Sequence, residues 1–282
     1  MQTPQRKVIN YFNNLESRLG YSLLLKGTKH FGYYPEGKEN LSIPSAQRLM
    51  EDELVLNLHL KKESYVLDAG CGEGIVASYL AKKYGLRITG IDLLDWSIKN
   101  SKRNAQKIKV EELVNFYVMD YTKLSFPNSH FDGVYTMETF VHSPDYRKGL
   151  QEFCRVLKPG GKLVMFEYSM SPLIDMTSEQ KRIAELIIKG SAMHSLPFFE
   201  HGKFPQLLKK AGFKDVKVEN ITDRVVPMMY KFYTWAYFPY QIIKLFKLQK
   251  YFINATSAFE SYKNIHLEHL DLWRYNIVTA TK

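Results

Sequence analysis

The chain has 282 residues, of which 45% are hydrophobic, so it is long enough and apolar enough to bury a sizeable core. Its two cysteines, Cys71 and Cys154, follow no disulfide or metal-binding spacing, which favours a reducing compartment and a cytoplasmic protein. Much of the formal net charge of +10 is lysine spread along predicted helices, so we interpret it as a solvated surface.

The start of the chain carries charged and amide side chains throughout, and we predict no signal peptide there. No window reaches the roughly 18 uninterrupted apolar residues that a membrane span requires. The nearest window, residues 228–246, is interrupted by two lysines, a proline and a glutamine. We expect the segment 228–252 to lie on a membrane surface rather than to cross a membrane.

Residues 1–60 precede any strand pattern, and we predict that they form an N-terminal helical cap. From residue 64 the chain alternates short β-branched runs with helical stretches, as a parallel sheet covered on both faces requires. The predicted strands are 64–69, 86–92, 113–120, 131–137 and 161–169, and the predicted helices are 74–85, 96–108 and 145–161, the last closed by Pro-Gly-Gly. The domain of residues 61–282 is therefore predicted to be of the α/β class.

The C-terminal part of this domain continues with a helix at 199–212, a strand at 213–222 and a final strand at 272–282. Between the last two strands lies a segment, residues 224–269, that has no glycine and many aromatic residues. We predict that it is an insertion that packs over the ligand site as a lid.

Three glycines, Gly70, Gly72 and Gly74, follow the first predicted strand. In a doubly wound sheet, ligands bind beyond the carboxyl ends of the strands, and glycine leaves no side chain between the backbone and a bound group. A dinucleotide fingerprint needs the spacing G-x-G-x-x-G, and here the third glycine comes one residue too early. The loop therefore predicts a different cofactor.

The motif D68-x-G-x-G-x-G resembles the first motif of the class I S-adenosylmethionine-dependent methyltransferases. The resemblance implies a Rossmann-like, seven-stranded, mostly parallel sheet, with Asp68 facing the amino-acid end of S-adenosylmethionine. Asp92 ends the second predicted strand, 18 residues past Gly74, where an acid accepts hydrogen bonds from ribose hydroxyls. Asp120 ends the third strand and matches the position beside the adenine, and Leu93 and Tyr121 follow two of these acids.

The run V134-Y-T-M-E-T-F-V-H-S-P144 resembles a stretch of the sterol 24-C-methyltransferases, and so do residues 157–170 and 204–213. The segment H30-F-G-Y-Y-P-E-G37 resembles an aromatic motif of the same family and also a segment of small-molecule O- and N-methyltransferases. The tail from Met228 onward and the residues directly after the glycine loop depart from the sterol enzymes. We therefore expect a lipophilic small molecule as acceptor and leave its identity open.

The resemblance implies two chemistries that share residues. If the acceptor is an alkene carbon, Tyr33, Tyr34, Glu138 and Glu167 are candidates for stabilising a carbocation, and His142 is the candidate base. Glu138 is also expected to touch the cofactor.

If the acceptor is a hydroxyl or amine, His142 acts as general base and Glu167 orients it, with His30 as a second candidate base. Each of these side chains also has a structural interpretation, as a wall residue or as a hydrogen-bonded core residue. We predict C-methylation of a sterol- or terpenoid-like molecule, with O- or N-methylation of a polyketide-, quinone- or indole-type metabolite as the alternative. The motif of nucleic-acid base methyltransferases is absent after the fourth strand, so no nucleic-acid partner is expected.

Overall fold

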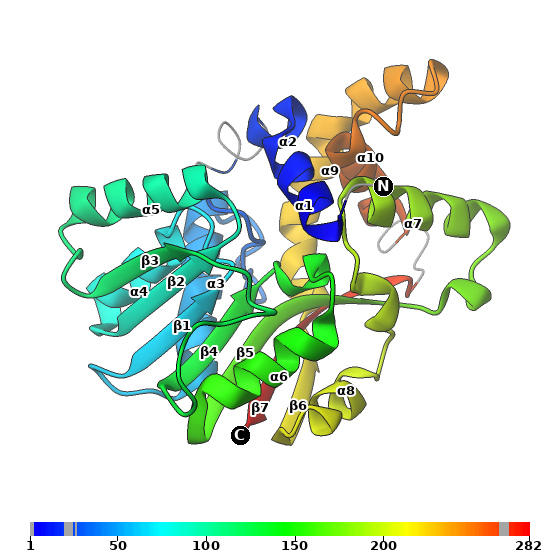
Figure 1. The fold of residues 1–282 in the computed structure, drawn as a ribbon. Helices are drawn as coiled ribbons and strands as arrows, with labels where there is room; N and C mark the ends of the chain where they lie inside the picture. The colour runs from blue at the N-terminus through cyan, green and yellow to red at the C-terminus, as the bar shows by residue number, and fades with distance from the viewer. Residues whose placement is uncertain (1–2, 20–24, 26, 265–270) are drawn as a thin grey trace.

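The computed structural model describes residues 3–19, 25, 27–264 and 271–282, and its centre is a seven-stranded sheet (Figure 1). The strand order is β3-β2-β1-β4-β5-β7-β6, and only β7 runs antiparallel to its neighbours in this described part of the chain. The strands are β1 Tyr65–Ala69, β2 Arg87–Asp92, β3 Val114–Val118, β4 Phe131–Met137, β5 Leu157–Met170, β6 Lys214–Asn220 and β7 Trp273–Thr281. The predicted α/β fold with a mostly parallel sheet is confirmed.

Helices connect these strands, and several of them gather beyond one end of the sheet (Figure 1). They are α1 Pro4–Asn13, α2 Leu15–Leu19, α3 Ile43–Leu58, α4 Ile75–Tyr84, α5 Asp95–Ile108, α6 Tyr146–Val156, α7 Ser178–Gly190, α8 Phe204–Lys210, α9 Thr222–Leu245 and α10 Ile253–Tyr262. Three short 3-10 turns accompany them, η2 Phe140–His142, η3 Leu173–Asp175 and η4 Leu196–Phe198. None of the helices in the described ranges is both long and apolar enough to span a bilayer.

Two predicted helix boundaries were wrong. The helix predicted at 145–161 ends at Val156, because Leu157 already pairs with Phe131 and the Pro-Gly-Gly run joins β5 instead of capping the helix. The helix predicted at 199–212 is confined to α8, because Gly202 has a left-handed φ of +76° that interrupts a helix before residue 204. Helix α7 was not predicted.

Alternating residues of each strand bury the two faces of the sheet in separate cores. Leu67 of β1 and Met165 of β5 belong to the core under α6 and α8. Their neighbours Val66 and Val164 belong to the core under α3, α4 and α5. Because successive strand residues point to opposite faces, both must be apolar when helices cover both sides. Helix α3 thus packs on the sheet, although it falls within the residues assigned to the cap.

The segment between β6 and β7 folds into the helical pair α9 and α10 (Figure 1). Tyr240 of α9 stacks on Phe259 of α10 with ring centroids 4.3 Å apart, and its hydroxyl donates a hydrogen bond to Glu260. Ile253 at the start of α10 shares a small core with Val8 of α1 and Ile183 of α7. These helices, with α2, gather at one end of the sheet (Figure 1).

The strand order places a crevice between β1 and β4. From β1 the chain proceeds outward to β2 and β3, and it then returns to β4 on the other side. The loops that follow the two strands therefore diverge and leave a space at the carboxyl end of the sheet, which is where doubly wound folds bind ligands.

Candidate active site

A pocket at this crevice, here called the glycine-loop pocket, is lined by residues that directly follow β1, β2 and β4. Gly70, Gly72, Asp92, Leu93 and Glu138 are among them. Gly72 has φ +51°, and a Cβ added there would meet nothing within 4 Å, so it leaves open space beside the backbone. This is the cradle expected of a glycine that lets a ligand approach the main chain.

Two acids of the pocket, Asp92 and Asp68, differ in their hydrogen bonding. Asp92 accepts hydrogen bonds from the Gly72 and Leu94 amides, both at 2.9 Å, and so ties the glycine loop to the end of β2. Asp68 is 3% exposed, and its Oδ2 has no hydrogen-bond partner among the described residues. Burial raises the pKa of Asp68 to about 7. A buried carboxylate oxygen without a partner fits the cationic amino group that the resemblance places beside it.

Some residues predicted to bind the cofactor do not line this pocket. A Cβ on Gly74 would lie 2.6 Å from Cβ of Ser101 and 2.7 Å from the Phe116 ring, so this glycine lets α4 pack closely on its neighbours. The Asp120 side chain accepts hydrogen bonds from the amide and hydroxyl of Thr122, both at 2.8 Å, and lies outside the pocket lining. Tyr121, which follows it, does line the pocket.

The N-terminal segment contributes to the lining of the glycine-loop pocket. Val8, Tyr11 and Phe12 of α1 line it, and Nζ of Lys29 lies 4.8 Å from the centroid of Trp96 and 5.3 Å from that of Phe12. The pocket volume is about 130 Å³, below the roughly 300–1,000 Å³ usual for small-molecule sites. The carboxylates and the glycine backbone fit S-adenosylmethionine, and α1 and Lys29 narrow the space beside them.

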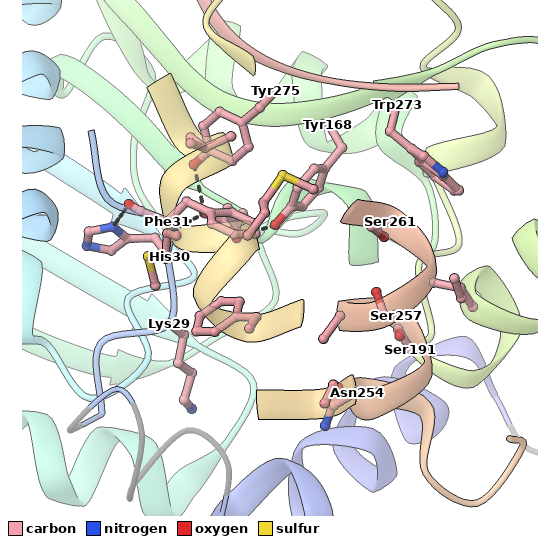
Figure 2. Close-up of a pocket in the computed structure, with 18 of the residues that line it drawn as sticks. Lys29, His30, Phe31, Tyr168, Ser191, Asn254, Ser257, Ser261, Trp273 and Tyr275 are labelled. Carbon is pink, nitrogen blue, oxygen red and sulfur yellow. Dashed lines mark hydrogen bonds between the residues drawn. The ribbon is translucent and has the colours of Figure 1, made fainter. Parts of the chain in front are cut away.

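A second and larger space, here called the apolar cavity, lies beside the first and has a volume of about 390 Å³. Helix α9 supplies an apolar wall through Val225, Met229, Phe232 and Ala236, and α10 supplies the facing residues (Figure 2). Both spaces share the lining residues Tyr11, Lys29, His30, Glu138, Tyr168 and Met193. A molecule in the apolar cavity is thus adjacent to whatever occupies the glycine-loop pocket.

Glu138 lines both the glycine-loop pocket and the apolar cavity, and its carboxylate accepts three hydrogen bonds. It accepts from the Phe31 amide at 2.5 Å, from the Tyr275 hydroxyl at 2.7 Å and from the Tyr168 hydroxyl. Burial raises its pKa, although these three donors favour the carboxylate. Its φ of +53° is left-handed, a conformation that surrounding contacts must hold in a residue with a side chain. Glu138 therefore holds two tyrosines and the 30–31 segment in place where the two spaces meet, here called the junction.

His30 lines both spaces, and both of its ring nitrogens have acceptors. Nδ1 lies 2.8 Å from the Phe31 carbonyl oxygen and Nε2 lies 3.3 Å from the Glu51 carboxylate. Burial by itself lowers the pKa of His30, but the Glu51 carboxylate outweighs burial and the net shift is upward. A ring that donates from both nitrogens has no lone pair for a base. Tyr33 lines neither space, and Tyr34 is fully buried.

His142 and Glu167, predicted to act together, have different surroundings and bond to different partners. His142 lines only the glycine-loop pocket, with Nδ1 3.3 Å from the Ala192 carbonyl oxygen, and burial lowers its pKa to about 4. Glu167 lines neither space and accepts the amides of Thr139 and Phe140 at 3.0 and 2.6 Å. Burial raises the pKa of Glu167 to about 8. Glu167 thus braces the turn after β4, where Glu138 sits.

Several junction residues were not predicted from the sequence. Phe31, Tyr168 and Tyr275 pack edge to face in pairs with centroid distances of 6.4, 5.7 and 5.4 Å. Tyr168 follows Glu167 in β5, and the period of two along a strand could have shown that only one of the pair faces the core below. Tyr275 comes from the distant β7, and no sequence pattern indicated that it would reach this site.

The fold and the pocket chemistry together define a class. A family profile described as a methyltransferase domain matches residues 67–165, from within β1 through the glycine loop to within β5. The chain belongs to the class I S-adenosylmethionine-dependent methyltransferase family and is an enzyme that uses S-adenosylmethionine.

Its relatives within this family include enzymes of two activities. The S-adenosyl-L-methionine-dependent Diels-Alderase iccD of Talaromyces variabilis is 34% identical over 287 residues, covering 100% of this chain and 96% of that protein. The sterol 24-C-methyltransferase erg-4 of Neurospora crassa is 32% identical over 200 residues, covering 71% of this chain and 52% of that protein.

Among solved structures, the [4+2]-cyclase SpnF has the same fold, with a TM-score of 0.77 at 22% identity and coverage of 100% and 97% of the two chains.

Proposed function

We propose that this enzyme binds S-adenosylmethionine in the glycine-loop pocket and catalyses a [4+2] cycloaddition of a lipophilic polyene held in the apolar cavity. The observation that carries the proposal is the chemistry of the cavity wall. Its glutamate shared with the glycine-loop pocket, Glu138, is held by three donors, and both ring nitrogens of its histidine, His30, face an acceptor oxygen. These two groups are therefore not placed to remove a proton.

A cycloaddition suits such a site because it needs no proton transfer. Three π bonds of the substrate become two σ bonds and one π bond, so the product is an isomer of the substrate and no atom is lost. The protein's task is to hold diene and dienophile in reacting geometry, which is worth up to about 7–11 kcal/mol in favourable cases. The bound cofactor supplies a fixed sulfonium charge at the junction.

The likeness to the Diels-Alderase supports this choice because it extends through both walls of the apolar cavity. It covers the whole chain, including α1, α9 and α10, whereas the likeness to the sterol methyltransferase covers 71% of the chain. The cavity is built largely from α9 and α10. The residues that hold a substrate are thus included in the longer match.

C-methylation of a sterol- or terpenoid-like alkene is the second candidate, and one observation favours it. Phe31, Tyr168, Tyr275 and Phe232 surround the junction with aromatic faces and edges. Such a group stabilises a carbocation formed when an alkene attacks the donor methyl group. O- or N-methylation is the third candidate; a hydroxyl acceptor needs a base to take its proton, whereas a neutral amine attacks the methyl group through its own lone pair.

The experiment follows the fate of the cofactor. The enzyme is incubated with trideuteromethyl-labelled S-adenosylmethionine and, separately, with 1,7,9-decatrien-3-one and with zymosterol. Cycloaddition gives a bicyclic isomer of unchanged mass with no S-adenosylhomocysteine, and it requires the cofactor. Deuterium in zymosterol with one S-adenosylhomocysteine per product would instead establish C-methylation and overturn the leading proposal.

We further propose that the outer end of α9 and the following turn dock on an anionic membrane surface of the cytoplasm. Phe238, Leu245, Phe246 and Tyr251 are 73%, 75%, 65% and 64% exposed. Lys244, Lys247 and Lys250 are interspersed with them, as on segments that combine apolar insertion with attraction to anionic lipid. Trp235, which lines the cavity, is 46% exposed and connects this surface to the cavity.

Cosedimentation with vesicles tests this docking. The protein should bind vesicles of phosphatidylcholine with 30% phosphatidylserine and lose most of that binding in the double variant Leu245→Glu, Phe246→Glu. Ile174→Glu, at a residue 87% exposed but distant in sequence from this surface, is the matched control. Equal binding by both variants contradicts the proposal, and a dimer that dissociates in the double variant assigns the surface to a second copy.

A further inference from the structure

Three serine hydroxyls face the apolar cavity from one side. Ser257 and Ser261 are four residues apart on α10, so they lie on the same face of that helix, and Ser191 follows the end of α7. Figure 2 shows the three on the side across from Lys29, His30 and Phe31. Here they are called the hydroxyl face.

None of the three hydroxyls has a hydrogen-bond partner among the described residues, and Ser191 is only 2% exposed. Several other polar side chains nearby are hydrogen-bonded, although Oε2 of Glu16, which also lines the cavity, has no partner among the described residues. On the same helix, Thr256 Oγ1 donates to the Phe252 carbonyl at 2.8 Å, and Asn254 bonds to Ser17 and Tyr11 at 3.0 and 2.7 Å. Ser191 is buried and Ser257 and Ser261 are partly buried, so a ligand oxygen that hydrogen-bonds to these hydroxyls adds stabilisation that the protein does not supply.

The remaining surroundings limit what that ligand can be. A hydroxyl both donates and accepts, so it pairs equally with a carbonyl or a hydroxyl oxygen. Two basic residues that line the cavity are Lys29 and Arg274, and Arg274 is bound to Asp271 at 2.8 Å. The α9 wall offers mainly apolar contacts to the rest of the molecule, with Thr222 and Trp235 as its polar-bearing members. The site fits a neutral lipophile that carries oxygen.

We propose that the hydroxyl face binds the carbonyl or hydroxyl oxygen of a neutral, oxygen-bearing lipophile and so determines which end of the substrate points toward α10. The proposal rests on the assignment of the apolar cavity as the substrate site. It excludes a plain hydrocarbon and a diphosphate as preferred ligands at this face. The opposite end of the substrate then lies at the junction beside Tyr168 and Glu138.

The test compares two fluorescent probes that differ by one hydroxyl group, retinol and its hydrocarbon analogue axerophtene. Both are titrated into protein saturated with S-adenosylhomocysteine. A net contribution of about 0.5–1.5 kcal/mol per hydrogen bond predicts that retinol binds about 5- to 150-fold more tightly through two hydroxyls. The double variant Ser257→Ala, Ser261→Ala and the single variant Ser191→Ala should lose most of that preference while binding axerophtene unchanged.

Thr256→Ala is the matched control, because its hydroxyl is on α10 but bonds to the backbone and does not line the cavity. It should keep the preference for retinol, and S-adenosylhomocysteine affinity should be the same in every variant. Equal affinity for both probes in the unaltered protein, or a preference that survives the serine variants, overturns the inference, since cavity water then satisfies the hydroxyls.

Failure of this inference is distinguishable from failure of the proposed function. A retinol preference that depends on the serines stands even if neither cycloaddition nor methyl transfer is observed. Conversely, product formation that continues in the serine variants, with no change in probe affinity, overturns only the role of the hydroxyl face. Absence of binding by both probes contradicts the assignment of the cavity itself.

Discussion

The glycine-loop pocket and the apolar cavity adjoin each other but come from different kinds of sequence. Most of the first comes from short loops that directly follow β1, β2 and β4, within residues 68–142. The second is assembled from α1, α7, α9, α10 and β7, which are spread over the whole chain. A short motif can therefore identify the donor site, whereas the substrate site depends on how distant helices pack.

The two regions also use polar groups differently. In the glycine-loop pocket, Asp92 holds the loop through two backbone amides, and one oxygen of Asp68 has no hydrogen-bond partner in the described structure. In the apolar cavity, Glu138 is engaged by internal hydrogen bonds, whereas the serine hydroxyls and Oε2 of Glu16 have no partner among the described residues. Mutations should therefore separate cofactor binding from substrate binding.

The largest expected effect is on cofactor affinity. Asp92→Ala should weaken S-adenosylmethionine binding about 10- to 100-fold, because charge-assisted hydrogen bonds are worth about 1.5–3 kcal/mol and the Gly72 amide loses its acceptor. Asp120→Ala should change affinity less than about fivefold, because Asp120 bonds to Thr122 outside the pocket. Calorimetry measures both affinities, and similar losses would show that Asp120 reaches the cofactor.

A complementary change should block the apolar cavity alone. Ala258→Trp places a large ring in the space between α9 and α10, and we expect at least a 30-fold loss of retinol affinity from overlap with the ligand. S-adenosylhomocysteine affinity should stay within about twofold, because Ala258 does not line the glycine-loop pocket. Ile174→Trp, at an exposed residue, controls for the added tryptophan. Parallel losses of both ligands would mean that the two spaces are not separable.

A smaller effect should appear in the pH dependence of cofactor binding. Burial raises the pKa of Asp68 to about 7 in the free protein, so below pH 7 this carboxyl carries a proton. A cationic amino group beside it favours the carboxylate, so binding expels that proton and affinity falls about tenfold between pH 8 and pH 6.

Calorimetry in buffers of different ionisation enthalpy counts the proton released. Release of up to one proton near pH 6, absent in Asp68→Asn, is the expected result. Asp120→Asn should keep the release. If no proton is released by the unaltered protein at pH 6, the amino group of the cofactor does not face Asp68.

The strand and helix pattern from residue 64 to 137 was predictable because local signals and tertiary burial agree there. Strands buried on both faces are continuous apolar runs, and the glycine loop follows the first of them. Prediction was weaker where tertiary contacts, rather than the local sequence, determine the secondary structure. The Pro-Gly-Gly run at 159–161 resembles a helix stop, but β4 pairs with Leu157 before the helix can reach it.

The sequence by itself determined the class of sheet, the place of the glycine loop and the cofactor, because each depends on residues within a few positions of one another. Only the tertiary structure decided that Glu138 is saturated by Phe31, Tyr168 and Tyr275, since these donors come from three distant segments. It likewise brought Ser191, Ser257 and Ser261 to one wall of the apolar cavity. Donor chemistry follows from a local motif, whereas acceptor chemistry follows from long-range packing, which no short pattern encodes.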